Sequence, residues 1–227
     1  MPIKIFGGIL MDFVKVDILK NEFVVEGSFY KVDVNNTEFQ CRNFAWIYRK
    51  DYKSQEKFDA LFVLVNPGQC MPKRSTYDIP QVPVGQIPVT YTLAKTDNTQ
   101  YQIMRCMKLK TWKNVLLINL SDLRAGNMAE FRQKLKLAEN NKFVNHSIFS
   151  PVRRQELNSI LSKLKGPIIL AWGTDPVIRK LAERAIQCLP KDNIIGMEHD
   201  RKPYYYHASP PPLKGKVKWL EYMRRLV

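Results

Sequence analysis

Four short apolar runs constrain the fold of this 227-residue chain more than any other feature. They occupy residues 60–65, 115–119, 167–172 and 193–197, and segments with helical periodicity separate them. Strands that are apolar throughout are buried on both faces, which is typical of parallel sheets with helical connections. The pattern therefore predicts an α/β fold with three layers (αβα) around a central, mainly parallel four-stranded sheet.

Two of the connecting helices carry recognisable boundaries. Asp175 followed by Pro176 is typical of a capped helix start, and a second helix is expected from about Pro151 to Leu164. A third helix is expected near the C-terminus, where apolar and basic side chains alternate at helical spacing over residues 216–226.

The N-terminal part has a different period. Residues 12–34 alternate between apolar and other side chains, with turn signals at Asn21-Glu22 and Gly27-Ser28. Alternation with a period of two indicates strands, so we expect an antiparallel hairpin or meander here.

The chain is strongly basic. Thirty-six Lys and Arg against 21 Asp and Glu give a net charge of +15. Such a charge predicts attraction to phosphates or anionic surfaces, and nucleic acid is the expected partner, with a membrane surface as the alternative. No apolar stretch approaches the length of a membrane-spanning helix, so we expect a cytoplasmic protein.

The four cysteines give no signal for a metal site. Cys41, Cys70, Cys106 and Cys188 are far apart and form no CxxC pair, so reduced thiols are expected, and no metal or other cofactor is predicted.

Polar motifs follow three of the apolar runs, at the ends where ligands bind in parallel sheets. Asn66-Pro67-Gly68 follows the first run, Asn119 closes the second, and Trp172-Gly173 closes the third. A further motif, His207-Ala208-Ser209-Pro210, lies in a proline-rich stretch near the C-terminus.

These motifs and their order resemble those of the uracil-DNA glycosylase superfamily, over roughly residues 58–213. The resemblance implies that Asn66 positions the attacking water, that Asn119 reads the base, and that His207 stabilises the departing base. It also implies that Pro67 and Gly68 contribute to base binding. Two residues depart from the family pattern: Gly68 stands where uracil-specific branches carry a tyrosine that excludes thymine, and Ala208 replaces a proline.

The chemistry of these side chains is compatible with those roles. The neutral amide of Asn66 can hold a water by its carbonyl oxygen but cannot act as a strong base. The donor and acceptor of Asn119 match N3–H and O4 of uracil, whereas cytosine presents the reverse pattern. The alternatives are structural: Asn66 shapes a turn, Asn119 caps its strand by bonding the Ser121-Asp122 loop, and His207 is held in a proline-rich loop.

Prolines punctuate the irregular segment of residues 71–92. A loop this long in a compact domain is often functional, and we expect it to lie directly above the Asn66 site. Tyr77 within it is the candidate aromatic residue for stacking on a flipped base. Leu213 is the candidate wedge that fills the space left by that base, with a core-facing loop residue as the alternative.

Basic and aromatic side chains surround the histidine motif. We expect Ser209 to hold a phosphate, and Tyr204, Tyr205 and Tyr206 to offer stacking surfaces. A solvated basic face is the alternative. The basic residues expected to track the DNA backbone are Arg201, Lys202, Lys214, Lys216 and Lys218.

Together these features predict one α/β domain over residues 1–227. It would comprise an N-terminal β extension (1–45), a glycosylase-like core (58–213) and a basic C-terminal helix (214–227). The expected function is hydrolysis of the N-glycosidic bond of a flipped uracil in single- or double-stranded DNA. The alternatives are a catalytically degenerate relative that binds DNA or a proteinaceous DNA-mimic inhibitor, and an RNA- or nucleotide-processing enzyme.

Overall fold

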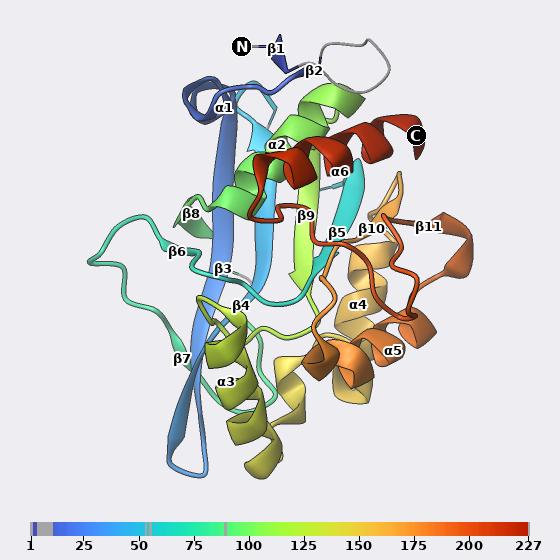
Figure 1. Ribbon diagram of the computed structural model, residues 1–227. Helices are drawn as coiled ribbons and strands as arrows, with labels where there is room; N and C mark the ends of the chain where they lie inside the picture. The colour runs from blue at the N-terminus through green and yellow to red at the C-terminus, as the bar shows by residue number, and fades with distance from the viewer. Residues whose placement is uncertain (1, 4–10, 53, 55, 89, 227) are drawn as a thin grey trace.

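A nine-stranded mixed sheet forms the centre of the protein in the computed structural model, which describes residues 2–3, 11–52, 54, 56–88 and 90–226. Within these residues the strand order is β11-β10-β5-β9-β4-β3-β8-β6, and β7 pairs with β3 (Figure 1). The strands are β3 (Phe23–Val34), β4 (Thr37–Arg49), β5 (Ala60–Leu64), β6 (Met71–Pro72), β7 (Gln81–Val82), β8 (Thr92–Lys95), β9 (Asn114–Asn119), β10 (Ile168–Leu170) and β11 (Ile194–Ile195). A separate antiparallel pair joins β1 (Pro2–Ile3) to β2 (Met11–Asp12).

The four apolar runs form the parallel part of this sheet, as the sequence predicts, but the sheet is mixed and has nine strands instead of the predicted four. β11 pairs with β10, β10 with β5, and β5 with β9, all in parallel register. Every residue of β5, β9 and β10 is buried. Their carboxyl ends therefore meet at one edge of the sheet, where the polar motifs follow them.

The N-terminal β structure differs in detail from the prediction. The hairpin joins β3 to β4 through Asn35 and Asn36, which have φ angles of 51° and 61°. Two consecutive residues with positive φ are typical of a two-residue hairpin turn. The predicted turn at Asn21-Glu22 is instead the end of helix α1 (Val16–Glu22), and Gly27-Ser28 lies inside β3. The hairpin continues the main sheet, because β4 pairs antiparallel with β9.

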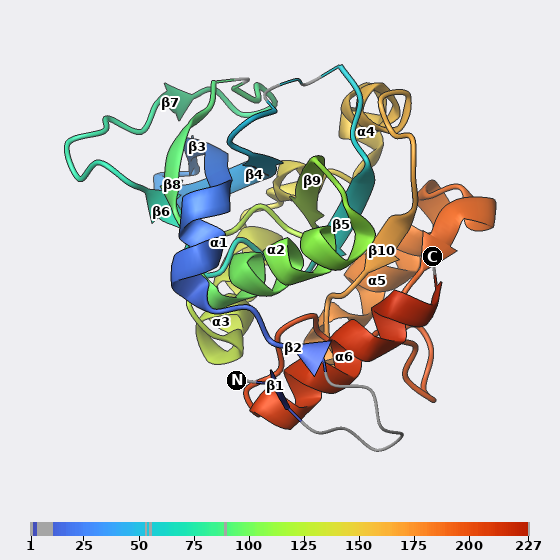
Figure 2. The same cartoon turned by 90° about the horizontal axis from the view of Figure 1, so that it is seen from above.

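Helices cover both faces of the sheet (Figure 2). Buried side chains of α1, α2 (Asn98–Lys110) and α6 (Leu213–Leu226) pack against one face. Those of α3 (Met128–Asn140), α4 (Arg154–Leu161) and α5 (Arg179–Cys188) pack against the other. The chain is thus a mixed α/β protein, and its apolar core lies in two clusters on either side of one sheet.

The predicted helices are present with small changes at their ends. The Asp175 side chain accepts a 3.0 Å hydrogen bond from the Val177 amide and caps a 3₁₀ turn that leads into α5. A second 3₁₀ turn, Pro151–Arg153, precedes α4. The C-terminal helix α6 starts three residues earlier than expected and buries Trp219 against the sheet. Within the described ranges, no helix combines the length and apolar character needed to cross a bilayer.

Candidate functional site

A cavity of about 510 Å³ lies at the carboxyl ends of β5 and β10, and we call it the inner cavity. It brings together segments that are far apart in the sequence. Asn66, Pro67 and Gly68 line it from the loop after β5, while His207 and Ser209 line it from the C-terminal loop. The proposed catalytic pair, Asn66 and His207, therefore shares one cavity.

The side chain of Asn66 is oriented by a backbone carbonyl. Its Nδ2 donates a 2.9 Å hydrogen bond to the carbonyl oxygen of Ala125, which fixes the amide plane. The carbonyl Oδ1 is then the atom left to accept a hydrogen bond from a ligand or water. Two residues later, Gly68 has a φ of +64°, a left-handed conformation that glycine adopts without strain. The Asn-Pro-Gly motif thus forms a tight turn that also presents Oδ1.

His207 is held in one tautomer by its own loop. The backbone N–H of Ser209 donates a 3.1 Å hydrogen bond to Nδ1 of His207. Burial lowers the pKa of the imidazole, and the opposing contributions from Ser209 and the Asp97 carboxylate do not reverse this direction. A neutral ring that accepts at Nδ1 carries its proton on Nε2. His207 is therefore a neutral hydrogen-bond donor through Nε2.

The Trp172-Gly173 dipeptide anchors the histidine loop to the end of β10. Trp172 Nε1 donates a 3.1 Å hydrogen bond to the carbonyl of Pro203, and the Gly173 amide donates a 2.9 Å hydrogen bond to the carbonyl of Tyr205. Gly173 has a φ of +88°, and a Cβ at this position would lie 3.9 Å from Cβ of His207. The dipeptide therefore positions the histidine.

Asn119 lies at the end of β9, next to Leu64 in the parallel register. It is fully buried and does not line the inner cavity, although its neighbours Leu64 and Leu117 do. Side chains alternate along a strand, so Asn119 lies on the same face as Leu117. Neither Oδ1 nor Nδ2 of Asn119 has a hydrogen-bond partner among the described residues. The loop that follows is held by other groups, so the strand-capping alternative has no hydrogen bond to support it.

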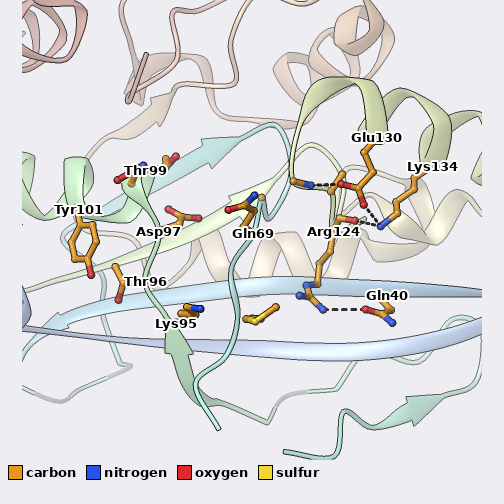
Figure 3. Close-up of a pocket in the computed structure, with 15 residues that line it drawn as sticks. Gln40, Gln69, Lys95, Thr96, Asp97, Thr99, Tyr101, Arg124, Glu130 and Lys134 are labelled. Carbon is orange, nitrogen blue, oxygen red and sulfur yellow. Dashed lines mark hydrogen bonds and ion pairs between the residues drawn. The ribbon is translucent and has the colours of Figure 1, made fainter. Parts of the chain in front are cut away.

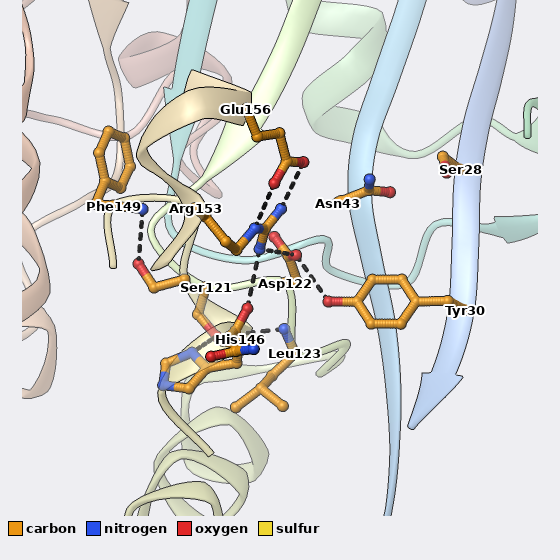
Figure 4. Close-up of polar contacts among 12 residues, drawn as sticks. Ser28, Tyr30, Asn43, Ser121, Asp122, Leu123, His146, Phe149, Arg153 and Glu156 are labelled. Carbon is orange, nitrogen blue, oxygen red and sulfur yellow. Dashed lines mark hydrogen bonds and ion pairs between the residues drawn. The ribbon is translucent and has the colours of Figure 1, made fainter. Parts of the chain in front are cut away.

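The loop after β9 is fixed by a buried polar network on the opposite face of the sheet (Figure 4). Arg153 donates hydrogen bonds to Asp122 at 2.5 Å and to both carboxylate oxygens of Glu156 at 2.6 and 2.8 Å. The hydroxyl of Tyr30 donates to Asp122 at 2.9 Å. The network connects β3, the β9 loop and α4, and it fixes the segment that follows Asn119.

An acidic residue that the motifs did not identify also lines the inner cavity. Asp97 caps α2, accepting a 2.9 Å hydrogen bond from the Gln100 amide through Oδ1. Its Oδ2 would lie 3.5 Å from a Cβ placed on Gly68. Asp97 and His207 both line this cavity, and the Asp97 charge opposes the lowering of the His207 pKa by burial. The spacing Asp-x-x-Gln is a readable capping signal, but only the fold brings this carboxylate to the cavity.

An arginine lines the same cavity without a counter-charge. Arg42 is only 1% exposed, and its Nε and Nη1 atoms are buried without a hydrogen-bond partner. Its backbone amide donates to the carbonyl of Asp122, which places the residue beside the carboxyl end of β9. Nothing in the local sequence around Arg42 distinguishes it from a surface arginine.

A larger, more polar hollow of about 770 Å³ adjoins the inner cavity, and we call it the outer groove (Figure 3). The two share five lining residues: Gly68, Asp97, Thr99, Ala125 and Gly126. Arg124 lies on one wall of the groove, where it donates hydrogen bonds to Gln40 and to the carbonyl of Cys70. The inner cavity therefore opens into a polar groove that is large enough to hold an extended, chain-like ligand.

Two predicted residues lie away from both hollows. Tyr77 lines neither of them, and among the described residues of the segment 71–92 only Met71 contributes to the outer groove. The segment runs instead along the edge of the sheet, where β7 pairs with β3. The prediction that it lies above Asn66 is therefore wrong. Leu213 begins α6, is 50% exposed and does not line the inner cavity.

The basic residues near the histidine loop are mostly at the surface. Arg201 and Lys202 line a third hollow beside Thr174, and Lys202 pairs with Glu198 at 2.5 Å. Lys214 and Lys218 are exposed and Lys216 is half-buried. Of the three neighbouring tyrosines, only Tyr206 is exposed, because Tyr204 and Tyr205 pack into the core. The prediction that all three offer stacking surfaces is therefore wrong for those two.

The cysteines and acidic residues form no metal-like cluster within the described residues, and the four thiols are unpaired. Cys41 and Cys106 are buried in the core. Burial raises the pKa of the Cys106 thiol to about 12, which keeps it protonated at neutral pH.

No curated protein matches the chain. Among solved structures, the primase fragment of the bacteriophage T7 primase-helicase protein is similar, with 12% identity and a TM-score of 0.33 over 86% of this chain and 66% of that fragment. The chain thus spans just under two thirds of that fragment, and a likeness this slight carries no argument. A family model described as "Protein of unknown function (DUF1643)" matches residues 80–207, a range that contains Asn119, Trp172-Gly173 and His207. Because this match covers more than half of the chain, the protein belongs to the DUF1643 family.

Proposed function

We propose that the inner cavity hydrolyses the N-glycosidic bond of a uracil nucleotide flipped out of DNA. The observation that carries this proposal is the pairing of Asn66 and His207 around one cavity, each held with a specific atom available. Asn66 Oδ1 is the acceptor and His207 Nε2–H is the donor. The covered parallel sheet is compatible with a three-layer glycosylase-like fold, in which these motifs would have the same order.

The chemistry requires opposite charges to be stabilised at two points. As the bond breaks, negative charge develops on the departing base and positive charge on the sugar. A neutral imidazole can donate a hydrogen bond to the base oxygen without needing deprotonation, and removing such a donor typically costs about 3 kcal/mol of transition-state stabilisation. His207 has this role in the proposal.

Asn66 and Asp97 act on the sugar side. Asn66 Oδ1 accepts a hydrogen bond from the attacking water and so holds it in position for attack. The Asp97 carboxylate lies at the entrance shared by the inner cavity and the outer groove, where a negative charge would stabilise a cationic sugar. Asp97 is a candidate to accept the proton that the water releases.

Asn119 supplies base recognition in this proposal. A fully buried amide without partners is unfavourable unless a ligand completes its hydrogen bonds. Uracil N3–H and O4 would satisfy the acceptor and donor of this side chain after a small rearrangement of the wall formed by Leu64 and Leu117. Asn119→Asp should therefore weaken uracil excision, and unchanged activity would remove Asn119 from the site.

DNA is the proposed partner. The basic charge of the chain favours phosphate binding, and Ser209 Oγ is a buried atom without a partner that lines the cavity. Lys214, Lys218 and Arg201 are exposed near the histidine loop and would contact the DNA backbone. Leu213 remains the candidate wedge because it is exposed at the start of α6.

The test is excision from a labelled oligonucleotide that contains one uracil, read as alkali-dependent strand cleavage on a gel. A matched oligonucleotide with thymine at the same position is the control, which also reveals whether Gly68 permits thymine to enter. Cleavage at uracil and not at thymine supports a uracil-specific activity. No cleavage of any uracil substrate contradicts it.

A second candidate is a degenerate glycosylase-like protein that binds DNA, or a protein that mimics DNA, without chemistry. Gly68 and Ala208 favour it, because both depart from the motifs of active relatives. DNA binding without excision would identify this function.

A further inference from the structure

The unpaired guanidinium of Arg42 is the least expected feature of the inner cavity. Arginine stays charged at all accessible pH values, so it cannot relieve its burial by losing a proton. Buried charges in proteins are normally paired, because removing a charge from water without a partner is strongly unfavourable. Arg42 is 1% exposed, and no ion pair or side-chain hydrogen bond joins it to another described residue.

The charged residues around Arg42 do not supply a partner for its guanidinium. Neither of the two acidic residues that line the same cavity bonds to Arg42: Asp97 accepts a hydrogen bond from the Gln100 amide, and Asp175 pairs with Arg132 at 3.1 Å. Arg124 is close enough to Arg42 for their like charges to interact, which lowers the pKa of Arg124 in addition to the effect of burial. Among the described residues, the Nε and Nη1 groups of Arg42 therefore have no bonded counter-charge.

The two other buried arginines show how this fold treats such a charge when its role is structural. Arg105, 7% exposed, donates hydrogen bonds to the carbonyl of Val14 and to the side chain of Gln102. Arg153, 4% exposed, binds the carboxylates of Asp122 and Glu156. Arg42 has no comparable partner, although it lies near that network on the opposite face of the sheet. The difference indicates that the partner of Arg42 comes from outside the chain.

We propose that the inner cavity binds a ligand that carries an oxyanion, a carboxylate or a phosphate, and that Arg42 is its buried recognition residue. The planar guanidinium suits two-oxygen groups of this kind, since it can donate parallel hydrogen bonds to both oxygens. Asn119, whose amide is also unpartnered near this end of β9, would contribute neutral donors and acceptors. Taken with the proposed function, on which the choice of base rests, the ligand is a pyrimidine bearing a carboxylate, or a nucleotide whose phosphate enters the cavity.

This inference concerns binding, and it holds whether or not the cavity cleaves a glycosidic bond. Its test is therefore binding alone: isothermal titration calorimetry and thermal unfolding of the whole protein. The probes are uracil, its 6-carboxylate orotate, inorganic phosphate and deoxyuridine monophosphate, all at matched ionic strength. A response to orotate alone identifies a carboxylated base, and a response to phosphate and the nucleotide identifies a phosphate ligand.

Three variants separate this site from nonspecific attraction to a basic protein. Arg42→Met should weaken anion binding by about tenfold or more. It should also raise the midpoint of thermal unfolding without ligand, because an unpaired buried charge has been removed. Arg42→Lys should retain part of the affinity. Arg154→Met, at an exposed site on α4 that does not line the inner cavity, is the matched control and should bind as the wild type does.

Two results overturn the proposal. One is that the wild-type protein binds none of the anionic probes, or binds uracil as tightly as orotate and the nucleotide. The other is that Arg42→Met binds the anions with unchanged affinity, which would place their site elsewhere. Because the Arg42→Lys variant keeps the charge, it reports on binding even if Arg42→Met folds poorly.

Discussion

The backbone amide of Ser209 donates a hydrogen bond to Nδ1 of His207 across 3.1 Å, so the histidine loop determines the tautomer of its own imidazole. The proton of the neutral ring is left on Nε2, and burial favours this neutral state. The loop in turn is attached to the end of β10 through Trp172 and Gly173. His207 is thus prepared as a donor before any ligand binds, which is a requirement of electrostatic catalysis.

The turn that presents Asn66 depends on the left-handed conformation of Gly68. Gly68→Ala should lower the free energy of unfolding by about 1 kcal/mol, because a Cβ is unfavourable at positive φ. The neighbouring space is not the cause, since the nearest atom would lie at an ordinary contact distance of 3.5 Å. Urea denaturation measures the change, and Gly68→Asn is the control with a smaller expected loss. Equal stability of the alanine variant and the wild type would contradict this account of the turn.

Arg153 stabilises the loop after β9 through its two carboxylate partners. Arg153→Met should lower the free energy of unfolding by about 3–5 kcal/mol, because it leaves Asp122 buried without its counter-charge. Arg42→Met is the matched comparison, and it should be stabilising in the absence of ligand. Denaturant titration of both variants measures the contrast. Similar losses at the two positions would show that Arg42 has a structural partner after all.

The acid sensitivity of the fold should include a measurable contribution from His146. Its Nδ1 lies 2.9 Å from the Ser121 hydroxyl, and burial lowers its pKa from 6.5 to about 4. The unfolded chain then binds a proton that the folded protein does not, so stability falls as the pH drops below about 6.5. The full contribution, reached near pH 4, is about 3 kcal/mol.

The measurement is the free energy of unfolding between pH 7 and 4 for the wild type and for His146→Gln. Burial raises the pKa of Asp122 to about 6, which acts in the opposite direction, so the difference between the two proteins is the informative quantity. The variant should lose less stability on acidification. A parallel pH dependence would show that His146 is protonated equally in the folded and unfolded states.

Binding to DNA should depend strongly on salt. Affinity should fall steeply as the salt concentration rises from about 50 to about 200 mM, because each neutralised phosphate releases counterions. Reversing the charge at Lys214, Lys216 and Lys218 together should flatten this dependence. Fluorescence anisotropy with a labelled oligonucleotide measures both, and an affinity that does not respond to salt would remove the main support for a DNA partner.

The parallel part of the sheet could be predicted because its signal is local. Leu61 to Leu64 and Val115 to Ile118 are apolar at every position, and only strands buried on both faces need that composition. Helix α1 was not predictable in the same way. Its seven residues are too few to separate a helical period from an alternating one, although Leu19 alone turns inward. The Asn35-Asn36 turn was a readable hairpin signal that the alternation upstream obscured.

The residues of the inner cavity likewise fall into two groups, those that the sequence predicts and those that it does not. Asn66 and His207 can be predicted from the sequence because each belongs to a short motif at a strand end or in a loop. Arg42 and Asp97 have no such signal, since their importance comes from burial and from contacts between distant segments. The position of Tyr77 was wrong for a related reason: the course of a long loop depends on tertiary pairing, here that of β7 with β3.

The central claim is that Asn66 and His207 act on a nucleotide bound between them, and single-turnover excision tests it most directly. Wild-type protein, Asn66→Ala and His207→Ala would be compared on one uracil-containing oligonucleotide, with DNA affinity measured in parallel. Each variant should excise uracil at least ~10²-fold more slowly, because each loses one preorganised group, while DNA affinity stays nearly constant. Wild-type protein that binds the oligonucleotide but releases no uracil, or variants that excise it at the wild-type rate, would contradict the account.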